Sequence, residues 1–182
     1  MGGKPSILLP KAPTLVVTAA VVIWLTSDGE IEELTREEAA ERLQKSPPPI
    51  VCHAPSSARR LGIEPFRAFD LLELFAFAVP AQFCIPTPRG VAGAMGLKVS
   101  GSRADEPLML RHSAQRLLIE IANRQYQSDT IAIAISMMHA GWLWSECVLA
   151  VLGANTGTAN QNTHTGLDIW RGLEEWSEEA PP

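Results

Sequence analysis

Residues 50–62 read Ile50-Val51-Cys52-His53-Ala54-Pro55-Ser56-Ser57-Ala58-Arg59-Arg60-Leu61-Gly62. An apolar run ends in His-Ala, a short polar linker follows, and a helix-like segment stops at a glycine. The stretch therefore predicts a short strand followed by a short helix over Ser56 to Leu61. The elements on either side of it decide which fold this unit belongs to.

The segments before this stretch have the character of strands. Two β-branched, continuous runs are typical of buried strands, and the Asp28-Gly29 pair predicts a hairpin turn. The alternating segment behind that turn indicates a return strand near an edge of a sheet. Thr35-x-x-Glu38 is a capping box that begins a helix, which Pro47-Pro48-Pro49 ends. The three predicted strands are Thr14–Ala19, Ala20–Thr26 and Glu30–Leu34.

The segments after the stretch are mainly helical. Phe69 to Val79 reads as a strand that turns helical, or as a buried helix. Thr87 as N-cap with Pro88 at the first helical position predicts a helix that stops at Gly96. Four further helices are predicted, at Pro107–Asn123, Thr130–Ala140, Trp144–Leu152 and Leu167–Trp176. Strands followed by alternating strands and helices predict an α/β fold, a mixed sheet flanked by helices.

Composition limits the possible functions. The chain has 182 residues, 46% of them hydrophobic and 19% charged, which suits one packed domain, or a domain with a small appendage. The net charge is −5, whereas a domain that grips nucleic acid through its phosphates is usually basic. Any contact with DNA is therefore expected to be local, weak or supplied by another domain.

Two features bear on the compartment. The apolar run from Leu15 to Leu25 follows two lysines like a signal peptide, but no small-x-small cleavage pattern follows it and its β-branched residues favour strands. The run is also too short to span a bilayer. No membrane contact is therefore expected. The three cysteines, Cys52, Cys84 and Cys147, form no CxxC pair, so a zinc site is not expected. We expect free thiols in a reducing cytoplasm instead.

Three segments carry a resemblance to a known family. The first is the His53 stretch, which resembles the His-Asn-x-x-Phe-Asp motif of DEDD-type proofreading exonucleases. The second is Ala68–Leu74 together with Pro88–Leu97, which resembles their Asp-Thr-Leu-x-Leu segment and following helix. The third, Arg111-His112-Ser113-Ala114, resembles the Ala-His-x-Ala of their last motif. The resemblance implies a ribonuclease-H-like fold over about residues 14–125.

The residues that bind metal in that family are missing here. Metal-dependent phosphodiester cleavage needs carboxylates clustered around two cations. The first strand, which carries Asp-x-Glu in the family, contains Thr18 and no acid. The aspartate position of the second motif holds Ala58, and the position five residues after His112 holds Leu117. We therefore expect no catalytic residue and no metal in this chain, with His53, Asp70 and His112 as remnants.

A second resemblance concerns the parent protein. Residues 49–97, Trp142-Leu143-Trp144 and the C-terminal Leu173–Trp176 resemble the N-terminal region of bacterial DinG-type ATP-dependent DNA helicases, some of which carry a degenerate exonuclease-like domain. The chain contains no GxxxxGK[ST] loop. The resemblance implies a docking, regulatory or DNA-guiding domain that acts in repair or replication beside a helicase motor in the same parent chain. ATP and magnesium would bind only in that downstream motor.

This interpretation divides the chain into four parts. Residues 1–13 would be a flexible tail and 14–126 the exonuclease-like domain. Residues 127–177 would form a helical extension that packs on the domain, and 178–182 would begin a linker.

Several residues have both a functional and a structural interpretation. Asp70 and Glu73 are either a lone metal pair or acids that cap a helix or pair with Arg59 or Arg67. His53 and His112 are site remnants or histidines with one satisfied hydrogen bond. Four arginines are candidates for a DNA-facing strip, although a solvated face is the default in an acidic chain: Arg59, Arg60, Arg67 and Arg89.

Four tryptophans in the last quarter are candidates for a surface that docks on the motor domain: Trp142, Trp144, Trp170 and Trp176. The alternative is that they pack the C-terminal helices onto the sheet. Two other functions remain open. An active hydrolase with a rearranged site would need Asp70, Glu73, His53 and His112 to converge in one cleft. A free-standing interaction protein would have no helicase partner.

Overall fold

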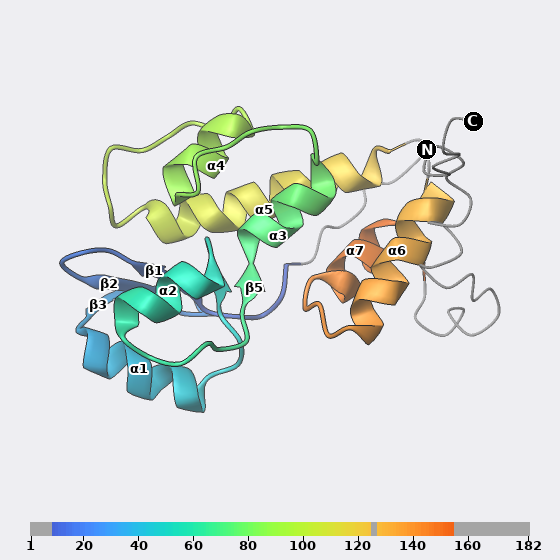
Figure 1. The fold of residues 1–182 in the computed structure, drawn as a ribbon. Coiled ribbons are helices and arrows are strands. Elements are labelled where there is room, and N and C mark those ends of the chain that lie inside the picture. The colour runs from blue at the N-terminus through green and yellow to red at the C-terminus, as the bar shows by residue number, and fades with distance from the viewer. Residues whose placement is uncertain (1–8, 125–126, 155–182) are drawn as a thin grey trace, which may run out of the picture.

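A mixed five-stranded sheet forms the middle layer of the computed structural model, which describes residues 9–124 and 127–154 (Figure 1). The strand order is β3-β2-β1-β4-β5. β2 runs antiparallel to both of its neighbours, whereas β1, β4 and β5 run parallel. The strands are β1 (Thr14–Val17), β2 (Val22–Leu25), β3 (Ile31–Leu34), β4 (Ile50–Val51) and β5 (Phe69–Asp70). This arrangement confirms the predicted α/β fold with a mixed sheet.

Helices cover both faces of the sheet. In Figure 1, α1 and α2 lie on one face, while α3, α4 and α5 lie on the other. α6 and α7 pack at the end of the molecule that carries β5. The helices are α1 (Arg36–Lys45), α2 (Ala54–Leu61), α3 (Leu71–Ala78), α4 (Pro88–Ala94), α5 (Glu106–Ala122), α6 (Gln127–His139) and α7 (Ser145–Val151). In the described part of the chain, no helix combines the length and apolar character needed to cross a membrane.

The alternation of side chains along the strands separates two cores. Val16, Ile23 and Ile50 point to one face, where they pack with the apolar residues of α3, α5 and α7. Leu15 and Trp24 point to the other face, beneath α1 and α2. Because both faces are covered, every residue of β1 and β2 is buried, which explains their continuous apolar sequence.

The two hairpins at the start of the sheet refine the predicted boundaries. The turn at Gly29, whose φ is +97°, and the edge position of β3 are as predicted. β1 ends earlier than predicted because Thr18 starts a turn, in which its hydroxyl donates to the carbonyl oxygen of Val21 at 2.7 Å. The apolar run from Leu15 to Leu25 is therefore an antiparallel hairpin within the sheet.

The helix starts follow the predicted capping residues. Thr35 and Glu38 form the capping box of α1, and Thr87 caps α4 with Pro88 at its start. The prediction for α2 was two residues too short, since the helix begins at Ala54 directly after its N-cap His53 and ends at Gly62. The His53 side chain makes no capping hydrogen bond, so another group must satisfy the start of α2.

That group is Asp70. The predicted strand-to-helix transition is present, with β5 ending at Asp70 and α3 starting at Leu71. One carboxylate oxygen of Asp70 accepts a hydrogen bond from the Leu72 amide at 2.9 Å. The other accepts from the Ala54 amide at 2.7 Å. A single buried carboxylate therefore caps two helices, and the expected pairing with Arg59 or Arg67 does not occur.

Residues near the first and the last described positions also pack into the core. Ala12 and Pro13 are buried, and Arg111 donates to the Ala12 carbonyl oxygen at 3.1 Å, so packed structure begins before Thr14. α6 and α7 contribute Ala134, Val148 and neighbouring residues to the core on the α5 face. The predicted helix Leu167–Trp176 and the predicted linker at 178–182 lie outside the described residues, as do residues 1–8.

Candidate functional site

A cleft of about 560 Å³ opens at the carboxyl end of β1. A smaller pocket of about 60 Å³ adjoins it at the end of β4, and the two share Val16, Val17, Arg60, Thr87 and Pro88. In open α/β sheets, ligands bind in the crevice outside the carboxyl ends of the strands, where the connections diverge to opposite sides. β1 has that position here, because β2 lies on one side of it and β4 on the other.

Four arginines line this cleft: Arg36, Arg60, Arg89 and Arg103. They come from four separate places, namely the start of α1, the last turn of α2, the start of α4 and the loop before α5. The single carboxylate among the lining residues is Glu106. We call these residues and the strand end between them the arginine cleft.

The local contacts hold three of these guanidinium groups in place. Arg60 Nη1 donates to the Val17 carbonyl oxygen at 2.8 Å, and Arg36 Nη2 donates to the Ala19 carbonyl oxygen at 2.9 Å. Arg89 forms an ion pair with Glu106, with 3.0 Å between Nε and Oε1. A guanidinium has five N–H donors, so Arg36 and Arg60 keep donors free for a ligand.

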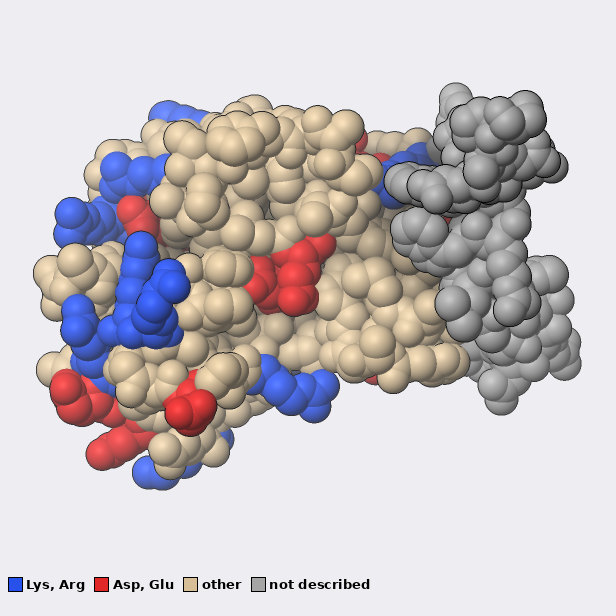
Figure 2. Space-filling model, in the orientation of Figure 1, with Lys and Arg blue, Asp and Glu red and all other residues tan. Residues whose placement is uncertain are grey.

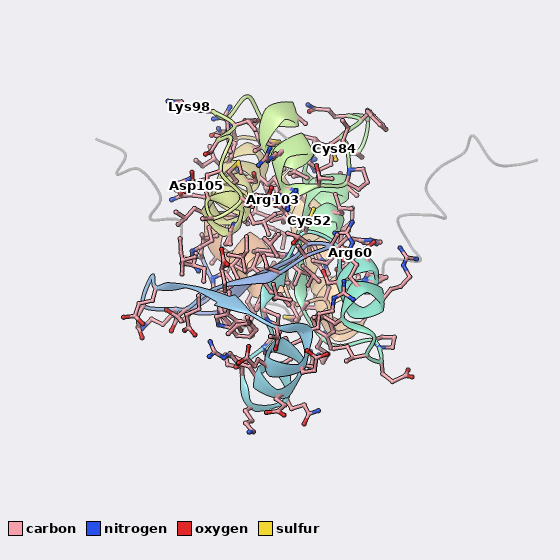
Figure 3. All side chains as sticks on the ribbon, turned by 90° about the vertical axis from the view of Figure 1, so that its left-hand side faces the viewer. Cys52, Arg60, Cys84, Lys98, Arg103 and Asp105 are labelled. Carbon is pink, nitrogen blue, oxygen red and sulfur yellow. The ribbon has the colours of Figure 1, made fainter. Side chains whose placement is uncertain are left out.

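Arg103 differs from the other three. Its guanidinium makes no hydrogen bond or ion pair with any residue that the structure describes. Figure 3, which faces this end of the molecule, shows Arg60 and Arg103 on either side of Cys52 in that view. Arg103 is therefore free to pair with an anion that enters the cleft.

The positive charge of this end is local. In Figure 2, Lys and Arg side chains gather near α2 and the β1–β2 hairpin, with acidic side chains beside and below them, and a further acidic patch lies in the middle of the face. The whole chain has a net charge of −5, so the four arginines of the cleft are a local cluster of positive charge within an acidic chain. Planar guanidinium groups match phosphate oxygens bidentately, which makes a phosphate the ligand that best fits this cleft.

The three positions predicted as degenerate metal ligands have different surroundings. Thr18 lines the arginine cleft, but its hydroxyl is engaged in the hairpin turn with Val21. Ala58 is buried in α2 and Leu117 is buried in α5. Within residues 9–124 and 127–154, no group of three or more His, Cys, Asp or Glu side chains could hold a metal ion. The polar groups that line the cleft are thus mainly cationic.

Cys52 lines the smaller pocket and is not a nucleophile there. Burial, together with a smaller effect of the nearby Asp70 carboxylate, raises the pKa of its thiol to about 12. A thiol with this pKa stays protonated at neutral pH, and only the thiolate attacks or binds metal. Burial also raises the pKa of Cys84, and all three cysteines are free thiols as predicted.

The predicted remnants do not share one cleft. His53 lines the smaller pocket and contacts the Ser56 hydroxyl through Nδ1 at 2.8 Å. Asp70 and Glu73 line a second cleft of about 350 Å³, whose lining includes Ala54 but not His53. His112 is exposed on α5 and lines none of these three cavities. The convergence that a rearranged hydrolase site requires is therefore not present.

The second cleft has a mixed character. The pKa of Glu73 is raised, first by partial desolvation and then by the neighbouring Asp70 carboxylate, while the Trp142 indole and His53 oppose the rise. The indole N–H of Trp142 lies near enough to Glu73 to lower the pKa of its carboxyl. Its geometry does not form a hydrogen bond with any described residue. Asp70 is occupied by two backbone amides, so Glu73 is the only carboxylate of this cleft with free oxygens.

The arginines of the predicted strip do not share one cleft. Arg60 and Arg89 line the arginine cleft, but Arg59 does not, and Arg67 lines the second cleft. Arg36 and Arg103 were missed. The sequence contained one indication that Arg36 is unusual. It occupies the first position of α1, where the helix dipole favours an acidic residue. The sequence contained no such indication for Arg103, because it is a single basic residue in a polar loop.

The tryptophans divide between core and surface. Trp144 is fully buried, and its indole Nε1 donates to the Asp70 carbonyl oxygen at 2.7 Å. It was wrong to predict Trp144 as part of a docking surface, because the indole fills the core between α7 and β5. Trp142 is half-buried and packs on Phe77 with 4.9 Å between ring centroids. Trp170 and Trp176 lie outside the described residues.

Comparisons with known proteins add no relative. No protein-family model, no curated protein and no solved structure matches the chain. The geometry of the clefts is therefore the basis for assigning a function.

Proposed function

We propose that this chain is a non-catalytic, ribonuclease-H-like domain that binds the phosphate backbone of single-stranded nucleic acid in the arginine cleft. It would act as a DNA-guiding module beside a helicase motor. The observation that carries the proposal is the presence of four arginines and one carboxylate at the carboxyl ends of β1 and β4. The helicase context comes only from the sequence resemblance.

The fold supports the first part of this proposal. The sheet order β3-β2-β1-β4-β5, with β2 as the antiparallel strand, agrees with the mixed sheet that the exonuclease resemblance implies. Thr18 lies at the end of β1, where those exonucleases carry a metal-binding acid. The same end of β1 here adjoins guanidinium groups, which supports a domain that would bind phosphates at this place without the metal chemistry of a nuclease.

The chemistry of the cleft supports binding without cleavage. Cleavage by two metal ions needs several carboxylates to hold the cations that activate water. Arginines instead neutralise phosphate charges directly and release the counterions condensed on the strand. The carboxylate that lines the cleft, Glu106, is paired with Arg89.

We expect this binding to depend strongly on salt and to leave the strand intact. If three or four phosphates are neutralised, the logarithm of the affinity should fall against the logarithm of salt with a slope of roughly −2 to −3. The measurement is fluorescence anisotropy of a labelled 12-nucleotide strand at 50 to 200 mM salt, with magnesium and manganese present. The strand is then sized by gel.

Either of two results would contradict the proposal. A strand that does not bind at 50 mM salt removes the binding function. A strand that is degraded in the presence of manganese, with degradation prevented by chelation, would instead favour a rearranged nuclease site. A duplex of the same sequence is the control, and it should bind less tightly if exposed bases contribute.

A further inference from the structure

An apolar pair of side chains lies in the chain segment that leads into the wall of the arginine cleft. Phe83 is 84% exposed and Ile85 is 59% exposed, the two highest values among the large hydrophobic side chains of the described residues. Both belong to residues 79–87, the connection between α3 and α4. Water-exposed aromatic area of this size costs free energy unless a ligand covers it.

The connection is held firmly on both sides of these residues. Gln82 Nε2 donates to the Ala94 carbonyl oxygen at 2.7 Å, and the Thr87 amide donates to the Ile85 carbonyl oxygen at 2.7 Å. Gly90 lies directly against Ile85, because a Cβ on Gly90 would overlap the Ile85 carbonyl oxygen and side chain. The exposure of Phe83 and Ile85 is therefore built into a packed turn.

The same turn forms a wall of the cleft. Pro86, Thr87 and Pro88 line the smaller pocket, and Thr87 and Pro88 also line the larger one beside Arg89. Phe83 precedes Pro86 by three residues, so their Cα atoms are at most roughly 11 Å apart. Phe83 therefore lies close enough along the chain to the cleft wall for a strand of several nucleotides to reach both Phe83 and the arginines.

We propose that Phe83, supported by Ile85, forms a stacking contact with a base of the single strand whose phosphates occupy the arginine cleft. This inference rests on the proposed function. Stacking on an aromatic ring tolerates any base, because every base has a π-face, and such rings commonly accompany a cationic groove that follows the backbone. Two apolar side chains are too few for a stable protein interface, which usually buries about 1,000 Å² or more.

The test compares two probes of equal charge. One is a labelled 12-nucleotide deoxythymidine strand and the other is an abasic phosphodiester chain of the same length. Phe83→Ala should weaken binding of the deoxythymidine strand by about 5-fold to 100-fold, the range for loss of one stacked base. The same variant should bind the abasic chain as the unaltered protein does. Phe83→Trp should restore the affinity for the deoxythymidine strand.

The outcomes separate this inference from the proposed function. If Phe83→Ala binds the deoxythymidine strand as tightly as the unaltered protein, the stacking contact is refuted while the arginine cleft stands. If the unaltered protein binds neither probe, the proposed function fails and the inference fails with it. Ile133→Ala is the control, since Ile133 is an exposed apolar side chain on α6, far along the chain from the cleft, and should change neither affinity.

Discussion

Replacing Trp144 with alanine is expected to lower the free energy of unfolding by about 3–5 kcal/mol, the usual cost of removing a buried tryptophan. The indole is fully buried, meets Phe69 edge-on at 5.1 Å between ring centroids, and donates a hydrogen bond to the Asp70 carbonyl oxygen. Its loss would leave a large cavity and remove the hydrogen bond between the indole and the Asp70 carbonyl oxygen. Urea denaturation measures this change.

Two phenylalanine variants give a matched comparison for this prediction. Trp144→Phe removes a hydrogen bond, whereas Trp142→Phe removes an indole N–H that has no partner among the described residues. The first should therefore cost about 1 kcal/mol more than the second. A Trp144→Ala protein as stable as the unaltered one would show that α6 and α7 do not share the core of the sheet.

Replacing Asp70 with alanine should cost about 2–4 kcal/mol, because the substitution removes the caps of two helices at once. The carboxylate is 3% exposed and accepts hydrogen bonds from Ala54 and Leu72, at the starts of α2 and α3. The positive ends of both helices also stabilise its negative charge. Thermal unfolding monitored by circular dichroism would measure the loss.

The neighbouring acid is the control for Asp70. Glu73 is exposed on the first turn of α3, so Glu73→Ala should change stability by no more than about 0.5 kcal/mol. Asp70→Asn should lie between the two, since its amide keeps one acceptor oxygen. Equal stability of Asp70→Ala and the unaltered protein would contradict the capping role and reopen a role for Asp70 in ligand binding.

Local signals in the sequence predicted much of the fold. The capping box at Thr35, the Thr87-Pro88 start and the glycine at the end of α2 depend on residues within one helical turn, and the structure has all three. The errors came from contacts across the chain. The start of α2 was misplaced because its capping carboxylate, Asp70, lies 16 residues further along the chain.

The arginine cleft was harder to predict for the same reason. Its arginines are spread from Arg36 to Arg103 and meet only because the ends of β1 and β4 adjoin α2 and α4. Arg59 and Arg60 are adjacent in sequence, but neighbours on a helix point about 100° apart, so only one of them lines the cleft. Net charge also concealed the site, because it averages the arginines of the cleft with the acidic side chains of the rest of the chain.

The most direct test of the arginine cleft removes two of its arginine charges. The affinity of this variant for a single strand is compared with that of a variant that loses two arginine charges outside the cleft. The cleft variant is Arg60→Ala with Arg103→Ala. The control is Arg59→Ala with Arg67→Ala, which removes the same charge from exposed positions that do not line the arginine cleft. Affinity for the labelled single strand is measured across a salt series.

The cleft variant should bind about 100-fold more weakly, because a hydrogen bond between charged groups contributes about 1.5 kcal/mol or more and two are lost. Its salt slope should also be smaller by about 1.4. The control should keep both the affinity and the slope. Equal affinities of the two double variants would contradict the assignment of the arginine cleft as the nucleic-acid site.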